Sequence, residues 1–356
     1  IVYFKPIKTA LCLLFILLEI NVLVAQDTIM ASNLDLKMSA EEYYNLGVKF
    51  VLDENYTEGI QALSAAIEKN ERFEKALLNR GIAYQKIRNF RNSNRDFDKV
   101  LLLNNSSDVA LFYRGLNHYF LDRELLAKED WYKAVFINEK NGDAHRYLGQ
   151  YHYLRKDYTL ALTHYQKAMT SGVQSAELYN DLGSTYRSLK RNQMAISHYI
   201  ESIRIDSNQA YVYNNLASAY KKEESYKRAL EVLNNGINRI SRNAFLHNNR
   251  GSVYFELKKY EEALADFDKS IDLDPNYFHA YNNRGACFMK LGKYQEALKD
   301  FDKAIEEKED YGSAYLNRGI VKELLYDLEG ACKDWTAAMD LGVFKAKKYI
   351  EDLCVE

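Results

Sequence analysis

Proline is almost missing from this sequence, with 2 residues in 356, and glycine is modest at 16. A collagen-like chain and a long Pro- and Gly-rich disordered chain are therefore excluded. Neither sign of charge dominates, because 48 lysines and arginines stand against 50 aspartates and glutamates. The basic excess that is typical of nucleic-acid-binding proteins is absent, so no nucleic-acid partner is predicted. With 28% charged residues and a mean hydropathy of −0.44, most of the chain is predicted to be soluble.

Motifs that carry known catalytic chemistry are missing as well. The sequence has no P-loop, no G-x-S-x-G turn, no H-E-x-x-H or C-x-x-C pair and no glycine-rich dinucleotide turn. Acidic residues are frequent, but they follow the regular spacing described below. We therefore predict a protein that is not an enzyme and that carries no cofactor and no metal.

The start of the sequence is its most apolar part. Lys5 and Lys8 precede the apolar run 10–25, which two polar residues interrupt. The run is shorter than the roughly 20 residues of a membrane span, and basic residues followed by such a run are typical of a signal peptide. We predict a signal peptide at 1–25, a linker at 26–39 and export to the periplasm, the cell envelope or the medium, with no membrane span after cleavage. An uncleaved anchor and an ordinary buried helix are the alternatives.

The rest of the sequence repeats itself every 34 residues. A small residue returns at that interval, at Gly47, Gly81, Gly115, Gly149, Gly183, Ala217, Gly251, Gly285 and Gly319. The units that it marks are 40–73, 74–107, 108–141, 142–175, 176–209, 210–243, 244–277, 278–311 and 312–345. No insertion interrupts them, so the array is predicted to have no internal domain boundary.

Each unit contains two apolar runs with helical spacing. In the seventh unit, Val253 and Leu257 follow Gly251, and after a polar stretch come Ala263, Leu264, Phe267 and Ile271. This spacing predicts two amphipathic helices joined by a tight turn. The small side chains at Gly251 and Ala263 are expected to let the two backbones approach closely.

The pattern resembles the tetratricopeptide repeat, whose signature of aromatic and small residues spans 34 positions. In the eighth unit the matching residues are Tyr281, Gly285, Phe288, Ala297, Phe301 and Ala304. The resemblance covers 40–345 and implies an all-α, right-handed α-solenoid of nine helix-turn-helix repeats, and the apolar face of 346–356 predicts a C-terminal cap helix. Only Pro275 fills the helix-ending proline position. Elsewhere Asn104, Asn138, Gly172 or Gly342 is expected to end the helix in the left-handed conformation.

Arginine and aspartate occur together at two positions of the repeat. Five units carry Arg before the small residue and Asp sixteen residues later: Arg80 and Asp96, Arg114 and Asp130, Arg250 and Asp266, Arg284 and Asp300, Arg318 and Asp334. The other units carry Leu46, Leu148, Leu182 and Leu216, with Ala62, His164, His198 and Val232. The joint replacement predicts structural ion pairs between the two helices of a repeat. An exposed row of ligand-binding arginines is the alternative.

The resemblance implies that the first helices line a groove that binds peptides or partner helices. Asparagines stand two and three residues before the small residue in the later units, at Asn180, Asn214, Asn215, Asn248, Asn249, Asn282 and Asn283. This row is similar to the asparagine ladder of O-linked N-acetylglucosamine transferases, and carboxamides suit the backbone of an extended peptide. Arg187, Lys221 and Lys222 add a basic stretch that favours an acidic segment or a C-terminal carboxylate. Solvated filler is the alternative for the asparagines.

The groove is predicted to change character along the array. Units one to three present an apolar stretch made of Tyr44, Val48, Phe112, Leu116, Tyr119 and Phe120. The whole pattern predicts a protein-protein interaction scaffold that holds an extended peptide or a partner protein in its groove. A self-assembling structural protein, and hence a homo-oligomer, is one alternative.

Histidines and cysteines supply the remaining candidates. His118, His145, His152, His164 and His198 cluster in the third to fifth units, where a metal or enzyme site is the alternative to core packing. Folding the chain back near Gly342 brings Cys332 level with Cys354, and the last segment resembles the close of many exported bacterial tetratricopeptide proteins. A disulfide between Cys332 and Cys354 is predicted, with two buried thiols as the alternative. Cys287 is expected to be a small packing residue.

Overall fold

The computed structural model describes residues 38–354, and within that range it contains 19 helices and no strand. The predicted signal peptide 1–25, and all but the last two residues of the predicted linker 26–39, lie outside the described residues. Within 38–354, no helix combines the length and the apolar character that a bilayer crossing requires.

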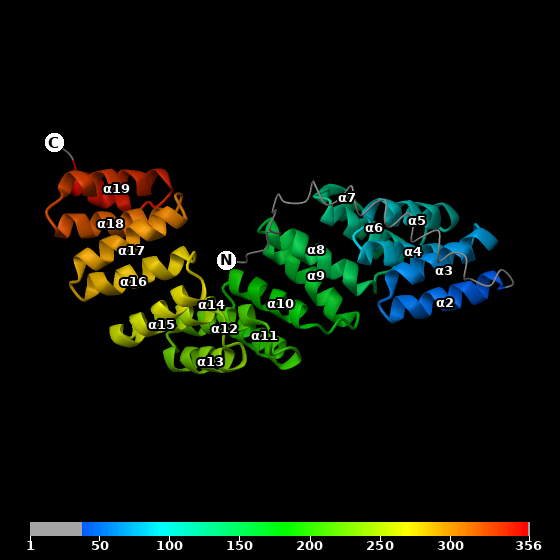
Figure 1. The fold of residues 1–356 in the computed structure, drawn as a ribbon, viewed down its shortest axis with the longest axis horizontal. Coiled ribbons are helices and arrows are strands. Elements are labelled where there is room, and N and C mark those ends of the chain that lie inside the picture. The colour runs from blue at the N-terminus through cyan, green and yellow to red at the C-terminus, as the bar shows by residue number, and fades with distance from the viewer. Residues whose placement is uncertain (1–37, 355–356) are drawn as a thin grey trace. The chain divides into compact units, whose positions relative to one another are not determined.

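Eighteen of the 19 described helices form nine pairs in the predicted register (Figure 1). The first helices are α2 (Ala40–Leu52), α4 (Glu74–Lys86), α6 (Asp108–Phe120), α8 (Gly142–Leu154), α10 (Ala176–Ser188), α12 (Ala210–Lys222), α14 (Ala244–Glu256), α16 (Phe278–Lys290) and α18 (Gly312–Leu324). The second helices are α3 (Tyr56–Lys69), α5 (Phe90–Leu103), α7 (Glu124–Ile137), α9 (Tyr158–Thr170), α11 (Asn192–Ile205), α13 (Tyr226–Arg239), α15 (Tyr260–Leu273), α17 (Tyr294–Glu307) and α19 (Leu328–Asp340). The last helix is α20 (Ala346–Leu353).

The chain divides into two compact units, which the uninterrupted repeats did not predict, and the division falls within α8, between Leu148 and Gly149. In each unit the two helices of a repeat pack as a hairpin, and the second helix also contacts the first helix of the next repeat, as α13 contacts α14. Consecutive first helices also approach one another, and α12 and α14 are an example. Consecutive second helices lie farther apart. The first helices therefore lie on the inner side of the curve of each unit.

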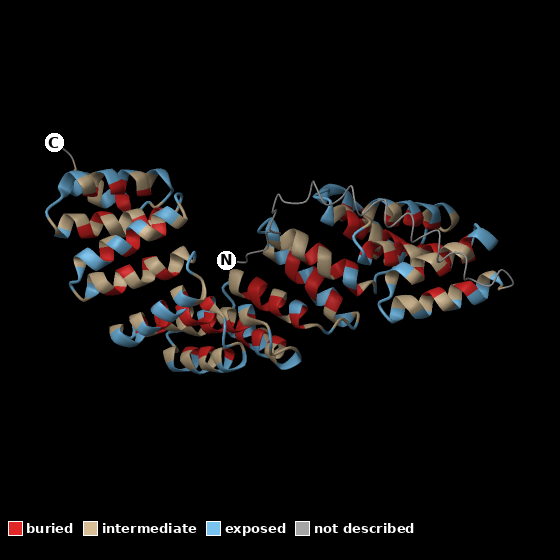
Figure 2. Cartoon of the chain, in the orientation of Figure 1, coloured by how far each residue is buried: buried red, intermediate tan, exposed pale blue. Residues whose placement is uncertain are grey.

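Close packing within a hairpin depends on the small residue of the first helix. A Cβ atom built on Gly81, Gly251 or Gly285 would lie 2.7 to 2.8 Å from the phenylalanine sixteen residues later. Those rings are fully buried, and so are Trp131 and Trp335 at the same position of other repeats. Figure 2 shows the buried residues as patches along the helices, with exposed residues on the opposite sides. The periodic small residue and the periodic aromatic residue thus form one packing unit.

The turn between the two helices contains one residue in the left-handed conformation. That residue is Glu54, Arg88, Asp122, Lys156, Lys190, Glu224, Lys258, Gly292 or Tyr326, with φ between 55° and 73°. Only one of the nine is glycine, so the turn carries no glycine signal in the sequence. Left-handed backbone costs a non-glycine residue roughly 1 to 2 kcal/mol, and this cost recurs in eight repeats.

The second helices end differently from the sequence-based prediction. Gly172 and Gly342 do take positive φ, at 96° and 83°, but the prediction for Asn104 and Asn138 is wrong, because their φ angles are −144° and −134°. Their side chains instead accept a hydrogen bond from the backbone N–H two residues later, at 3.1 and 3.0 Å. Such an Asx turn gives a backbone N–H a hydrogen-bond acceptor after the end of the helix. The chain therefore turns there without a residue in the left-handed conformation.

The last helix covers the final repeat. Ala346 is fully buried, and the ring of Tyr349 stacks on Trp335 of α19 with 4.9 Å between ring centroids. Ile350 and Cys354 pack on the same apolar cluster. This helix closes the apolar flank that the last hairpin of a repeat array would otherwise expose.

Candidate functional site

All five predicted Arg–Asp partners lie together between the helices of a repeat. In each pair, arginine Nε donates to aspartate Oδ2 at 2.8 Å and Nη2 donates to Oδ1 at 2.6 to 2.8 Å. This is the two-pronged geometry that makes guanidinium–carboxylate pairs strong. The arginine side chains are 15 to 22% exposed. Their donors are directed into the protein, which disfavours an exposed ligand-binding row.

A third contact, absent from the sequence-based predictions, connects each arginine to the preceding repeat. Nη1 donates to the residue sixteen positions before the arginine at 2.6 to 2.9 Å, namely Ser64, Asp98, Asn234, Asp268 and Asp302 in turn. We call the arginine and its two partners the arginine clamp. Three of these acceptors are the second aspartate of an Asp-Phe-Asp run such as 300–302. The Asp-Phe-Asp run was the signal in the sequence that could have revealed this contact. Its first aspartate binds the arginine of the same repeat, and its second aspartate binds the arginine of the next repeat.

The buried aspartates differ in charge environment from one clamp to another. Burial acts to raise the pKa of Asp266, but hydrogen bonds from Arg250 and His247 outweigh it, so this pKa is lowered. His247 Nδ1 lies 3.2 Å from Asp266 Oδ1. At Asp300, burial outweighs the hydrogen bond from Arg284 and raises the pKa. The histidine beside Asp266 and the negative charge of Asp268 near Asp300 account for the opposite directions.

Most of the asparagine row is paired along the array. Nδ2 of Asn215, Asn283 and Asn317 donates to Oδ1 of Asn180, Asn248 and Asn282 in the preceding repeat, each at 2.9 Å. The three acceptor residues are buried, with 4 to 7% of their surface exposed. The sequence predicted the row but not this pairing, whose signal is a spacing of 35 residues. The row therefore helps to join the repeats and keeps only part of its hydrogen-bonding capacity for a ligand.

One position in the row is different. Asn214 Oδ1 is buried and has no hydrogen-bond partner among the described residues. The equivalent partner would be Asn249, which is partly exposed. A buried acceptor without a partner costs on the order of 1 to 3 kcal/mol. Asn214 is thus the one asparagine of the row that is short of a donor in the described part of the chain.

The predicted basic stretch lies on the same face of α10 and α12. Arg187 is partly buried, Lys222 is exposed, and Lys221 Nζ donates to Ser252 Oγ of the next repeat at 2.9 Å. Ser184 of α10 is buried, and its Oγ lies 3.1 Å from the hydroxyl of Tyr199. Two cationic groups, Arg187 and Lys222, therefore remain at the surface beside the asparagine row.

In the compact unit that ends at Leu148, part of the predicted apolar stretch is buried. Phe112 and Leu116 are at most 9% exposed, whereas Phe120 is 47% exposed. A buried polar network was not predicted: Gln85 Nε2 donates to Asn117 Oδ1 at 2.6 Å, and Asn117 Nδ2 donates to Ser93 Oγ at 2.7 Å. Val48 and Tyr119 are partly exposed, and Tyr44 accepts a long hydrogen bond from Asn79 at 3.5 Å.

The histidines are packed against aromatic rings and neighbouring polar atoms. His152 stacks on His164 and His198 on Tyr186, with 5.6 and 5.1 Å between ring centroids. His145 Nε2 lies 3.2 Å from the carbonyl oxygen of Glu139, and His118 lies 3.9 Å from Asp130. Within residues 38–354, no three His, Cys, Asp or Glu side chains are grouped so that they could hold a metal ion.

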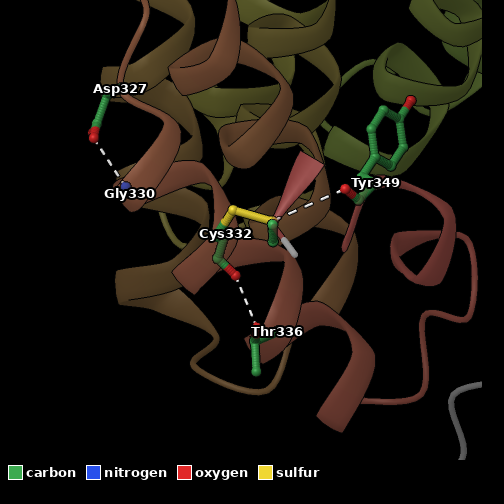
Figure 3. Close-up of a disulfide and its surroundings, with 6 residues drawn as sticks. Asp327, Gly330, Cys332, Thr336 and Tyr349 are labelled. Carbon is green, nitrogen blue, oxygen red and sulfur yellow. Dashed lines mark hydrogen bonds between the residues drawn. A yellow bond between two sulfur atoms is a disulfide. The ribbon is translucent and has the colours of Figure 1, made fainter. Parts of the chain in front are cut away.

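Cys332 and Cys354 form a disulfide that ties α19 to the end of α20 (Figure 3). Their Cα atoms are 5.8 Å apart, and Thr336 Oγ1 donates to the carbonyl oxygen of Cys332 at 2.8 Å. Cys287 is fully buried and free, and burial raises the pKa of its thiol to about 12. Cys287 therefore behaves as a packing residue.

Comparisons with known proteins agree with this geometry. Residues 244–277 and 279–311 match one sequence model of the tetratricopeptide repeat, and 176–209 and 210–241 match a second. No curated protein matches the sequence. Among solved structures, yeast Tom70 is similar over 95% of this chain and 93% of its own, with 14% identity and a TM-score of 0.53. The C-terminal part of a TPR repeat-containing protein from Cytophaga hutchinsonii is similar over 67% of this chain and 98% of its own, with 16% identity and a TM-score of 0.51.

The solved structures support the all-α repeat solenoid, and the sequence matches identify the repeat type. The matched repeats share their helix register, their small residue and their buried second-helix residue with the unmatched ones. The chain is therefore a tetratricopeptide repeat protein, with the fold of a protein-interaction scaffold.

Proposed function

We propose that the first-helix face of the fifth to eighth repeats binds an extended, acidic peptide segment of a partner protein. The segment would lie across α10, α12, α14 and α16, because the asparagine row and the basic side chains occupy these helices. Carboxamides both donate and accept hydrogen bonds, so they suit a peptide backbone whatever its side chains are.

The unpartnered oxygen of Asn214 carries this proposal. The neighbouring positions of the row are satisfied within the protein, through Asn180 with Asn215 and Asn248 with Asn283, whereas Asn214 Oδ1 lacks a donor. A backbone N–H of a bound peptide is a donor of the required kind, and it would reach the oxygen once the Asn214 carboxamide rotates toward the peptide. Binding would remove the cost of the unsatisfied acceptor, so the bound state is favoured at this position.

Charge supports an acidic segment. Arg187 and Lys221 lie on the last turns of α10 and α12, and Lys222 is exposed next to Lys221. Rim charges of this kind mainly speed association and select partners of opposite charge. Raising the salt concentration is therefore expected to weaken capture of the partner.

The test is capture of proteins from native cells on the immobilised intact chain and on an Asn214→Ala variant. Asn45→Ala is the matched control, because Asn45 is an exposed asparagine of α2 outside the proposed face. We expect a partner that binds the intact chain and the control but is lost from Asn214→Ala. Peptides from that partner with single backbone N-methyl groups should then lose affinity at one position.

Stability measurements separate loss of a contact from loss of the fold. Asn214→Ala removes an unsatisfied buried acceptor, so the free protein should become slightly more stable while binding weakens. Asn248→Ala removes the hydrogen bond to Asn283 and should lower stability by about 1 kcal/mol. Equal capture by the intact chain and by Asn214→Ala would contradict the proposal.

We also propose that the protein works in an oxidising compartment outside the cytoplasm. The disulfide between Cys332 and Cys354 supports this, because such bonds persist mainly in exported proteins. Protein isolated from native cells under alkylation should contain the two cysteines linked. Recovery of both as alkylated thiols would argue against export.

A further inference from the structure

The sixth repeat lacks the arginine clamp and has apolar side chains at the positions of the clamp. The clamp of Arg284 consists of Asp268 in the seventh repeat with Arg284 and Asp300 in the eighth. The equivalent positions are Ile200 in the fifth repeat with Leu216 and Val232 in the sixth. The fifth repeat also lacks the arginine, but there the ring of His198 takes the aspartate position and stacks on Tyr186. The three replacements around the sixth repeat are aliphatic side chains, which place no charge and no hydrogen-bonding group between the helices.

A cavity of about 750 Å³ lies at these positions, between α11, α12 and α13. We call it the notch. Its apolar wall consists of Ile200, Ile203, Leu216 and Val232, and Ile200 is 44% exposed, so the notch opens to solvent. The volume is within the range of about 300 to 1,000 Å³ that is usual for ligand sites. It is formed largely by second helices, away from the asparagine row.

The rim of the notch is polar and positively charged. Arg204, Arg239, Asn235 and Asn238 line it, and all four are exposed. Arg239 Nη1 donates to Ser207 Oγ at 3.1 Å and has no carboxylate partner in the described part of the chain. Arg204 binds Glu201 at 2.7 Å, but an exposed pair of this kind contributes little and can be exchanged for another carboxylate.

We infer that the notch is a second docking site, which takes a short acidic peptide segment with one large apolar side chain. The apolar side chain would enter between Leu216 and Val232, and neighbouring carboxylates would meet Arg239 and Arg204. An apolar anchor in a pocket with a polar rim is the usual arrangement of an interaction hot spot. The open mouth and the two arginines favour such a segment over an alkyl chain, which would leave much of its length in water.

The probe is an N-acetylated Glu-Glu-Phe-Glu-Glu amide, titrated into the intact chain with labelled isoleucine, leucine and valine methyl groups. We expect saturable shifts of the methyl signals of Ile203, Leu216 and Val232. The peptides Lys-Lys-Phe-Lys-Lys and Glu-Glu-Ser-Glu-Glu are the matched controls for charge and for the apolar anchor, and both should bind at least about fivefold more weakly. Decanoate is the control for an alkyl carboxylate.

Two variants test the site without relying on loss of the fold. Ile200→Asp, Leu216→Arg and Val232→Asp together rebuild the clamp of the eighth repeat and replace the apolar wall of the notch by a closed ion pair, so binding of a fluorescent version of the peptide should disappear while the helical spectrum is kept. Arg204→Gln with Arg239→Gln leaves the cavity intact and should weaken binding about fivefold, as expected for two exposed charge pairs.

The inference is overturned if the lysine peptide shifts the same methyl signals equally well, if the clamp variant binds like the parent, or if decanoate saturates the notch at lower concentration than the peptide. Asn214→Ala should leave this binding unchanged. The notch and the proposed first-helix site can therefore fail independently.

Discussion

Phe301 occupies the space that a side chain on Gly285 would need, since a Cβ atom there would lie 2.8 Å from Cε1 of the ring. Gly285→Ala should therefore lower the free energy of unfolding by about 1 to 2 kcal/mol, because crowding of the core exceeds the gain in helix propensity. Urea denaturation followed by circular dichroism measures the change.

The sixth repeat supplies the control for this prediction. It combines Ala217 with Leu233, a smaller partner at the ring position. Adding Phe301→Leu to Gly285→Ala should therefore cost less than the sum of the two single changes. Strictly additive costs would show that the two residues are not one packing unit.

The clamp of Arg284 and Asp300 is the clearest place to test the coupled ion pair. Arg284→Leu leaves Asp300 buried without its partner and should cost about 3 to 5 kcal/mol. Arg284→Leu combined with Asp300→Val should recover much of this loss, because the sixth repeat already has that pair of residues. A double-mutant cycle in thermal or urea unfolding gives the coupling energy. A value near zero would contradict the energetic pairing of Arg284 with Asp300.

Two substitutions at the turn position should change the free energy of unfolding in opposite directions. Gly292 and Lys258 occupy the same turn position with φ of 73° and 59°, and no atom lies within 4 Å of a Cβ built on Gly292. Gly292→Ala should therefore cost about 1 kcal/mol from backbone strain alone. Lys258→Gly should stabilise the protein by about 0.5 kcal/mol. Changes of the same sign would mean that the side chains, and not the backbone, decide stability at this turn.

Stability should fall as the pH drops below about 6.5, the usual histidine value. Burial lowers the pKa of His198, and burial likewise lowers the pKa of His118 and of His279. Just below pH 6.5 the unfolded chain binds a proton at these residues and the folded chain does not, so unfolding is favoured. Above that pH their contribution is fully present. Urea midpoints between pH 7.5 and 5 measure the slope, and His198→Phe should make it shallower; an unchanged slope would contradict the assignment.

Reduction of the disulfide should loosen the end of the chain. Cys332 and Cys354 are 22 residues apart, and a loop of that length corresponds to about 3 kcal/mol of stabilisation. Backbone amides of α20 should exchange hydrogen faster after reduction or in Cys354→Ser, while amides in α2 to α5 should be unaffected. Equal exchange in α20 before and after reduction would show that packing of Tyr349 alone holds the helix.

The periodic features of the sequence were sufficient to predict the helix pairs and the Arg–Asp partners between them, but the contact of the small residue with the aromatic ring was not predicted. Gly285 with Phe301, and Arg284 with Asp300, lie sixteen residues apart in one hairpin, so a single spacing could have revealed both. The left-handed turn position stayed hidden, because residues as different as Tyr326 and Lys258 occupy it and the hairpin geometry overrides their preference.

Contacts between repeats were the harder part. The link from Asn215 to Asn180 and the link from Arg284 to Asp268 depend on how neighbouring hairpins stack, which the pattern within one repeat does not specify. The notch was not predicted for a related reason. Its apolar wall combines Ile200, Leu216 and Val232, three residues on three helices, none of which is unusual by itself.

The third hydrogen bond of the arginine clamp has a mechanical consequence. Where the arginine is present, a charged cross-link adds to the apolar packing between adjacent hairpins, and the fourth, fifth and sixth repeats have leucine instead. When the array is pulled or bent, we expect the hairpins of these three repeats to separate first. The distribution of one residue type along the chain would then set where the scaffold flexes to fit what it holds.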